Sequence, residues 1–164
     1  MVSKSFESKY APQMMWKRAA RIIREPADIL LSLQLGYFIW RVPAWLDRMP
    51  LPQLLQALQS APPPPSSSFD ASLERIQRLI RPWFKLPMFR NRNTCYLRSL
   101  LFYRFLDPHD KSKRIHFVVE PSRAPGARLH GHAWVTIGDQ LIEPPLPDIL
   151  ARTQSIYTYP PHAT

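Results

Sequence analysis

The chain has one cysteine, Cys95, placed where an irregular basic segment gives way to an apolar helical pattern. Residues 95–106 (CYLRSLLFYRFL) predict a helix with Cys95 at its N-terminus. Unpaired backbone N–H groups and the positive end of the helix dipole favour the nucleophilic thiolate there. The same N–H groups suit a developing oxyanion. The alternative is an inert cysteine that faces inward in the first helical turn.

A predicted β-hairpin follows 37 residues later and supplies the other groups that a thiol hydrolase needs. His132 opens the hairpin, Gly138 and Asp139 form its turn, and Glu143 ends the returning strand. An imidazole beside the sulfur stabilises the thiolate and protonates a leaving amine, and a third group orients the ring. Glu143 and His132 fall at the open end of the hairpin, so Glu143 is the favoured orienting carboxylate. Asp139 is favoured as a turn residue, and His132 as an ordinary strand histidine stays the alternative.

Metal binding is a weaker interpretation of the same histidines. His130 and His132 share a strand face, and His109, His116 and Cys95 could add ligands. The chain has neither an HExxH pattern nor a cysteine pair, so we expect no metal and no other cofactor. One cysteine also excludes an internal disulfide.

The elements that must position these groups are helices first and strands last. Helices are predicted over 13–24, 27–41, 52–59, from about 70, and over 95–106, and strands over 115–120, 132–137 and 140–143. Asp70 is the expected N-cap of the fourth helix, whereas Pro43, Pro82 and Pro87 are expected to end or break helical segments. This order predicts an α+β fold, with helices packed on one face of a small antiparallel sheet.

A run of four prolines and three serines over 61–68 divides the chain. It predicts a linker between an N-terminal helical region, 1–60, and a catalytic region, 69–164, which together form one compact unit.

Composition limits the partners and the compartment. Apolar residues make up 45% of the 164, and 22 Lys+Arg against 12 Asp+Glu give a charge of +10. These cations are scattered and accompany no nucleic-acid-binding motif, so solvated basic helix faces are favoured over a surface for an acidic partner. The N-terminus lacks a signal-peptide pattern, and the most apolar window, 29–40, is too short to span a membrane. We therefore expect a cytoplasmic protein without a membrane span.

Taken together, the helix Cys95-Tyr96-Leu97-Arg98-Ser99-Leu100-Leu101 and the hairpin His132-Ala133-Trp134-Val135 resemble the transglutaminase-like, papain-related cysteine peptidases. More narrowly, they resemble the leader peptidases of lasso-peptide biosynthesis. The resemblance implies a transglutaminase-like core in which Cys95 is the nucleophile and His132 the base. The third residue of the family, usually Asp, falls near the end of the returning strand, where Glu143 is the closest carboxylate.

The resemblance also implies a reaction and partners. Such a peptidase removes the leader from a ribosomally made precursor peptide, which a separate leader-recognition protein presents, and an ATP-dependent cyclase then closes the ring. Two other functions stay open: a non-catalytic peptide or nucleic-acid binding module, and an acyl transferase in which an amine resolves the thioester.

Arg98, one turn after Cys95, is either a surface charge or part of an ion pair that anchors the helix.

Overall fold

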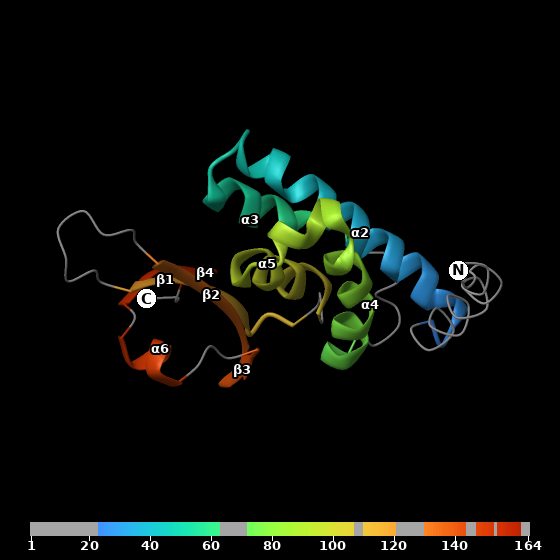
Figure 1. Ribbon diagram of the computed structural model, residues 1–164. Helices are drawn as coiled ribbons and strands as arrows, with labels where there is room; N and C mark the ends of the chain where they lie inside the picture. Colours follow the sequence, from blue (N-terminus) through green and yellow to red (C-terminus); the bar gives the residue numbers. More distant parts are fainter. Residues whose placement is uncertain are drawn as a thin grey trace, which may run out of the picture.

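Within the described residues, four α-helices and one 3-10 helix precede the first strand, where the whole sequence predicts five helices. The computed structural model describes residues 23–62, 72–106, 110–120, 130–143, 147–152 and 154–161 (Figure 1). Its elements are α2 (Pro26–Leu46), α3 (Leu51–Ser60), α4 (Leu73–Lys85), the 3-10 helix η2 (Pro87–Arg92), α5 (Cys95–Phe105), β1 (Lys113–Glu120), β2 (His130–Ile137), β3 (Gln140–Ile142), α6 (Pro147–Arg152) and β4 (Gln154–Tyr159). The predicted helix over 13–24 and most of the linker over 61–68 lie outside the described residues.

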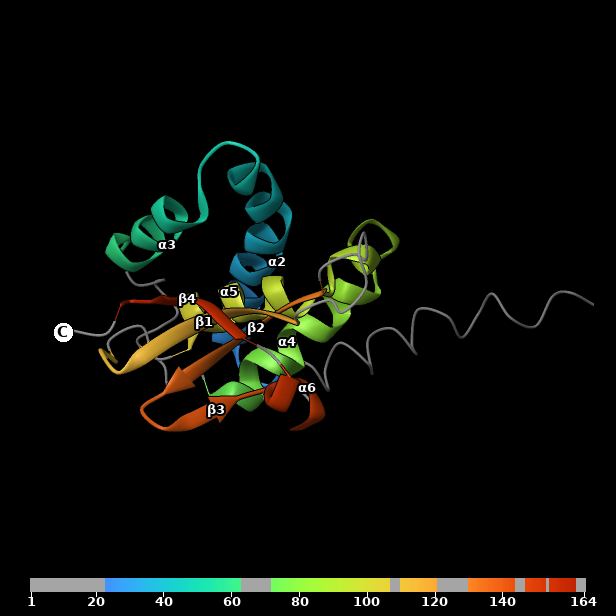
Figure 2. The same ribbon diagram turned by 90° about the vertical axis from the view of Figure 1, so that its left-hand side faces the viewer.

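The strands form one antiparallel sheet in the order β3-β2-β1-β4. Strand alternation gives its two faces different neighbours. Ala133 and Val135 of β2 point into the hydrophobic core that α5 shares, whereas Trp134 stacks on His116 of β1 with ring centroids 5.9 Å apart. Figures 1 and 2 show α6 on the opposite side of the sheet from α5. The fold is therefore α+β, as predicted.

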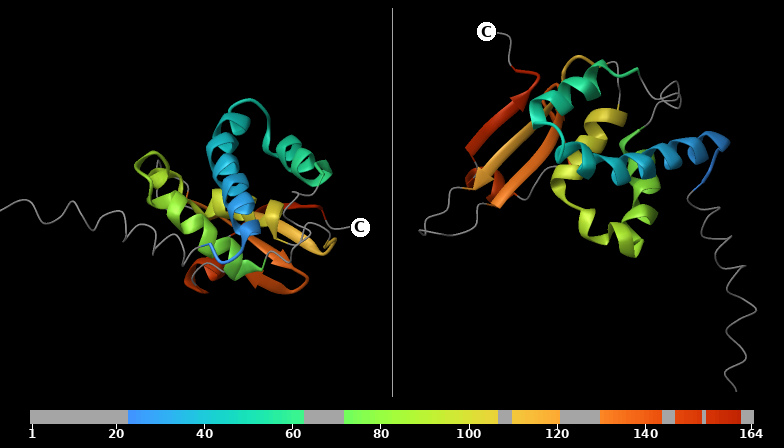
Figure 3. Two further views of the ribbon diagram at one scale, coloured as in Figure 1. Left: turned by 90° about the vertical axis from the view of Figure 1, so that its right-hand side faces the viewer. Right: turned by 90° about the horizontal axis from the view of Figure 1, so that it is seen from above.

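Helix α5 is the layer between the sheet and the other helices. It packs on β1 and β2 on one side and on α2 and α4 on the other (Figure 3). Its apolar residues Leu97, Leu100, Leu101 and Phe105 are all buried. The N-terminal helices therefore reach the sheet mainly through α5.

Helices α2 and α4 meet at a glycine. A Cβ atom at Gly36 would lie 2.4 Å from the ring of Trp83, so only glycine lets the indole rest on the α2 backbone. The Trp83 Nε1–H group donates to Ser32 Oγ at 3.1 Å. This contact sets how closely the two helices approach.

A buried carboxylate joins the same two helices at the start of α2. Asp28 is fully buried, accepts from Arg75 Nε at 2.8 Å and Arg78 Nη2 at 3.1 Å, and also accepts the backbone N–H groups of Arg24 and Glu25. Burial alone raises the pKa of Asp28, but these hydrogen bonds and the charge of Arg75 outweigh it and lower that pKa. Asp28 lies in the first turn of α2, near the positive end of the helix dipole.

Two prolines expected to stop helices lie inside them. Pro43 is within α2, where its missing N–H leaves the carbonyl of Ile39 without its usual helical donor. Arg92 replaces that donor, because its Nη1 bonds the carbonyl oxygens of Ile39 at 3.2 Å and Trp40 at 3.1 Å. Pro82 likewise lies inside α4. Both expectations were wrong.

The N-cap of α4 and the C-terminal elements also differ from the predictions. Ser72 is the N-cap of α4, where its Oγ accepts the N–H of Arg75 at 3.3 Å; Asp70 lies outside the described residues. Helix α6 and strand β4 were not predicted at all. Strand β4 pairs with β1, with a register shift between Phe117 and Val118.

Helix α2 is longer than the apolar window that the sequence suggested. At 21 residues it is long and apolar enough to cross a membrane, so the expectation that it is too short was wrong. Length and composition alone do not distinguish a membrane span from a core helix. One third of its most apolar window is buried inside the fold.

Candidate active site

The thiol of Cys95 is exposed at the first position of α5. Thr94 caps this helix, since its Oγ1 accepts the N–H of Leu97 at 3.2 Å. The Cys95 thiol lies 3.9 Å from the carbonyl oxygen of Gly131 in β2. The alternative of an inward-facing cysteine was therefore wrong, and the sulfur lies at the surface where α5 meets the sheet.

His132 follows Gly131 directly, so the backbone that carries the imidazole lies beside the thiol. Strand β3 pairs with β2 only from Val135 to Ile137, which leaves the edge of β2 at His132 outside that pairing. Alternation along β2 places the half-buried His132 side chain on the face of Trp134, away from α5. Within the described part of the chain, no hydrogen bond joins the His132 imidazole to Cys95 or to Glu143.

Glu143 is bound to two helices. Arg98 Nε donates to one of its carboxylate oxygens at 2.7 Å, and Arg98 Nη2 donates to the other. Gln77 Nε2 of α4 donates to the same carboxylate at 2.5 Å. Arg98 thus forms the ion pair that the sequence left open, and it ties α5 to the end of β3. The orienting role of Glu143 toward His132 stays a prediction.

The backbone of Glu143 has an unusual conformation. Its φ angle is +51°, in the left-handed region that favours glycine, and such a conformation costs a side-chain-bearing residue about 1–3 kcal/mol. The contacts with Arg98 and Gln77 hold it there. Asp139, by contrast, lies in the β2–β3 turn as predicted, beside Gly138 with its φ of +56°. The two carboxylates are therefore at opposite ends of the hairpin.

His116 belongs to the face of the sheet that also carries His132. Its Nδ1 lies 3.2 Å from Thr158 Oγ1 and its Nε2 lies 3.0 Å from Thr136 Oγ1, while its ring stacks on Trp134. The sequence suggested His116 only as a metal ligand. The alternation of β1 and β2 could have placed it beside Trp134, but the pairing with Thr158 needs β4. No group of three or more His, Cys, Asp or Glu that could hold a metal occurs among the described residues.

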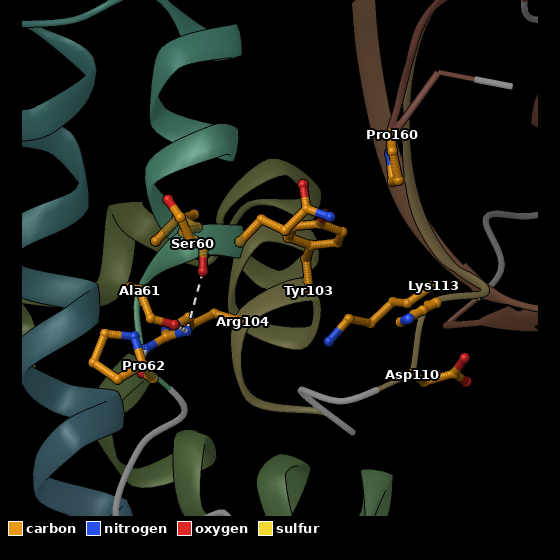
Figure 4. Close-up of a pocket in the computed structure, with 11 residues that line it drawn as sticks. Ser60, Ala61, Pro62, Tyr103, Arg104, Asp110, Lys113 and Pro160 are labelled. Atoms are coloured by element: carbon orange, nitrogen blue, oxygen red, sulfur yellow. Dashed lines mark hydrogen bonds between the residues drawn. The ribbon is translucent and has the colours of Figure 1, made fainter. Parts of the chain in front are cut away.

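A pocket of about 330 Å³ lies at the other end of α5, where Figure 4 shows Tyr103 between Arg104, which points toward Ala61 and Pro62, and Lys113. Arg104 donates to the carbonyl oxygens of Leu58 and Ala61, both at 3.1 Å, at the end of α3. Burial lowers the pKa of Arg104 and raises that of Tyr103. Arg104 is nine positions after Cys95, about 13 Å along the helix axis, so this pocket is not the thiol site.

Comparison with known proteins assigns the family. A family model described as the transglutaminase-like superfamily matches residues 38–157, which is more than half of the chain and includes Cys95, His132 and Glu143. A search of the curated proteins and a search of the solved structures each gave no match. The fold of this family is commonly that of cysteine peptidases and acyl transferases. The chain belongs to the transglutaminase-like superfamily.

Proposed function

We propose that this protein is a cysteine peptidase that removes the leader from a ribosomally made precursor peptide during lasso-peptide maturation. The observation that carries the proposal is the exposed Cys95 thiol at the start of α5, 3.9 Å from the carbonyl oxygen next to His132. The resemblance of the Cys95 helix and the HAWV strand to the lasso leader peptidases supports the substrate class. No cofactor takes part in the proposed reaction.

The proposed reaction has two steps. The Cys95 thiolate attacks the carbonyl carbon of the last leader residue, and the N–H groups at the start of α5 bind the oxyanion. His132 protonates the leaving amine, which becomes the N-terminus of the core peptide, and the leader stays attached as a thioester. Water then attacks that thioester, which releases the leader with a free carboxylate and restores the thiol.

His132 must approach Cys95 for this chemistry. Since the His132 side chain lies on the face away from α5, the proposed reaction requires the backbone of β2 at His132 to turn toward the sulfur; strand β3, which pairs with β2 only from Val135 to Ile137, does not hold this part of the edge. Glu143 keeps its predicted orienting role if one carboxylate oxygen leaves Arg98 or Gln77 for His132. If it does not, the carboxylate acts only as the anchor of α5.

The proposal includes partners. The chain acts in the cytoplasm on a precursor peptide that a separate leader-recognition protein presents, and an ATP-dependent cyclase then consumes the core peptide. The described part of the N-terminal region consists of the helices α2 and α3.

The test uses the full chain, the precursor peptide encoded beside its gene and the neighbouring leader-recognition protein. Mass spectrometry should find a leader with a free carboxylate and a core peptide with a new amine. Cys95→Ala should abolish both products, and the neighbouring change Tyr96→Phe should not. A leader joined to an amine would indicate an acyl transferase. Full cleavage by Cys95→Ala, or no reaction of Cys95 with iodoacetamide, would refute the peptidase and favour a binding module.

A further inference from the structure

An apolar stripe runs along the outer side of α2. Ile29, Leu33, Tyr37 and Trp40 follow each other at spacings of four, four and three residues, so they lie on one helix face. Their exposed fractions are 50%, 58%, 54% and 52%, and Leu30 beside them is 46% exposed. Large apolar side chains so exposed and so continuous indicate a binding surface rather than scattered surface residues.

The rest of α2 is covered by the fold. Leu31, Leu35 and Ile39 are buried in the core, and Gly36 lies under the ring of Trp83 from α4. Figure 3 shows α2 on the outside of the helical layer, with α5 between it and the sheet. The stripe is therefore the side of α2 that the described fold leaves open.

Cationic side chains accompany the stripe. The Arg41 guanidinium lies 5.6 Å from the centre of the Trp40 ring. Arg24 and Arg48 are exposed near the two ends of α2, as are the neighbouring Glu25 and Asp47. The chain that leads into α2, residues 1–24, contains six Lys or Arg and one Glu. The excess of cations in the sequence that leads into α2 thus favours an anionic partner.

We propose that this stripe seats the protein on the surface of an anionic lipid bilayer, with α2 lying parallel to the membrane. Trp and Tyr side chains prefer the interface between headgroups and acyl chains, and Lys or Arg beside them attract anionic lipids. The helix lies on the bilayer rather than crossing it, because Asp28 is held by Arg75 and Arg78 and the inner face of α2 belongs to the core. The proposal does not depend on the proposed peptidase activity.

The test is sedimentation of the full chain with lipid vesicles. It should bind vesicles that contain phosphatidylglycerol, bind those of phosphatidylcholine alone much more weakly, and dissociate as salt is raised. The double change Tyr37→Ser and Trp40→Ser should weaken binding by at least about tenfold, since both side chains insert. Leu141→Ser in β3, 38% exposed, is the matched control and should bind normally. Circular dichroism melts check that each variant is folded.

Three results would overturn the proposal. The first is no binding to anionic vesicles at low salt. The second is binding that the double change leaves intact, which would mean that charge alone attracts the protein. The third is a dimer, or a complex with the leader-recognition protein, that the double change abolishes while vesicle binding persists. That outcome would assign the stripe to a protein partner.

Discussion

Separate substitutions of Arg98 and Glu143 distinguish an anchoring role of this ion pair from a catalytic one. The two side chains are only 28% and 24% exposed, and two N–H groups of Arg98 reach the two carboxylate oxygens. A charge-assisted hydrogen bond contributes about 1.5–3 kcal/mol, and partial contact with water reduces the cost of losing its partner. We therefore expect Arg98→Met and Glu143→Gln each to lower the free energy of unfolding by about 2 kcal/mol. For a chain of this size that corresponds to a fall in Tm of about 4–8 °C.

The assay is urea unfolding followed by circular dichroism, on both single variants and the double variant. Because the two residues contact each other, the double variant should lose less than the sum of the single losses, with a coupling free energy of about 1–2 kcal/mol. The same proteins are then assayed for leader removal over a range of pH. An orienting carboxylate would make Glu143→Gln slower than Arg98→Met by at least about a hundredfold.

The outcomes are separable. If Glu143 only anchors α5, the two single variants lose stability and activity in parallel, and neither changes the shape of the pH profile. If it orients His132, Glu143→Gln alone shows the large loss of rate. Urea midpoints equal to the wild-type value in both single variants would refute the reasoning, because the ion pair would then contribute nothing measurable.

Two further predictions concern the helical layer. Asp28→Asn should lower the free energy of unfolding by about 3 kcal/mol, because it weakens the ion pair with Arg75 in a buried site. The pKa of Asp28 is lower in the folded than in the unfolded state, so its carboxylate stabilises the fold above the unfolded-state pKa. This stabilisation is lost as the pH falls through the folded-state pKa. Urea midpoints measured from neutral to acidic pH should therefore fall less steeply in Asp28→Asn than in the wild type. Arg92→Ala should lower the free energy of unfolding by about 1–2 kcal/mol. The loss should be smaller in a Pro43→Ala background, where a restored N–H can bond the Ile39 carbonyl. Urea unfolding of the wild type, the two single variants and the double variant measures the difference.

The elements that the sequence predicted well are those specified by local patterns. The helix at Cys95 and the turn at Gly138 depend on residues within a few positions of each other, and the structure contains both. Pro43 shows where local reasoning ends. The hydrogen bond that Pro43 removes from α2 is replaced by one from Arg92, 49 residues later in the chain. No residue near Pro43 in the sequence indicates that donor. Strand β4 was missed for a similar reason: Tyr157 and its neighbours suit a strand, but their partner β1 is distant in the sequence and prolines follow them directly.

In the candidate site too, local features were predicted from the sequence and contacts between distant residues were not. The position of Cys95 at a helix start followed from the sequence, and its exposure resolved the alternative that local periodicity left open. The contacts of Glu143 could not be predicted, because they join residues from α4, α5 and the end of β3 that are distant in the sequence. Gln77, Arg98 and Glu143 are also residue types that are mostly exposed at protein surfaces. Hairpin geometry placed Glu143 near the open end correctly, but it could not assign which neighbour the carboxylate binds.

Helix α5 explains how these features act together. Its first residue brings the thiol to β2, Arg98 in its second turn holds the end of β3, and Arg104 in its last turn binds carbonyl oxygens at the end of α3. The distance between the sulfur and β2 thus depends on a helix held at both ends. Since Arg98 of α5 binds Glu143 after β3, we expect a change at Glu143 to alter the placement of the thiol without touching it. Loss of activity in a Glu143 variant therefore identifies a catalytic carboxylate only when the Arg98 variant, which releases the same anchor, stays active.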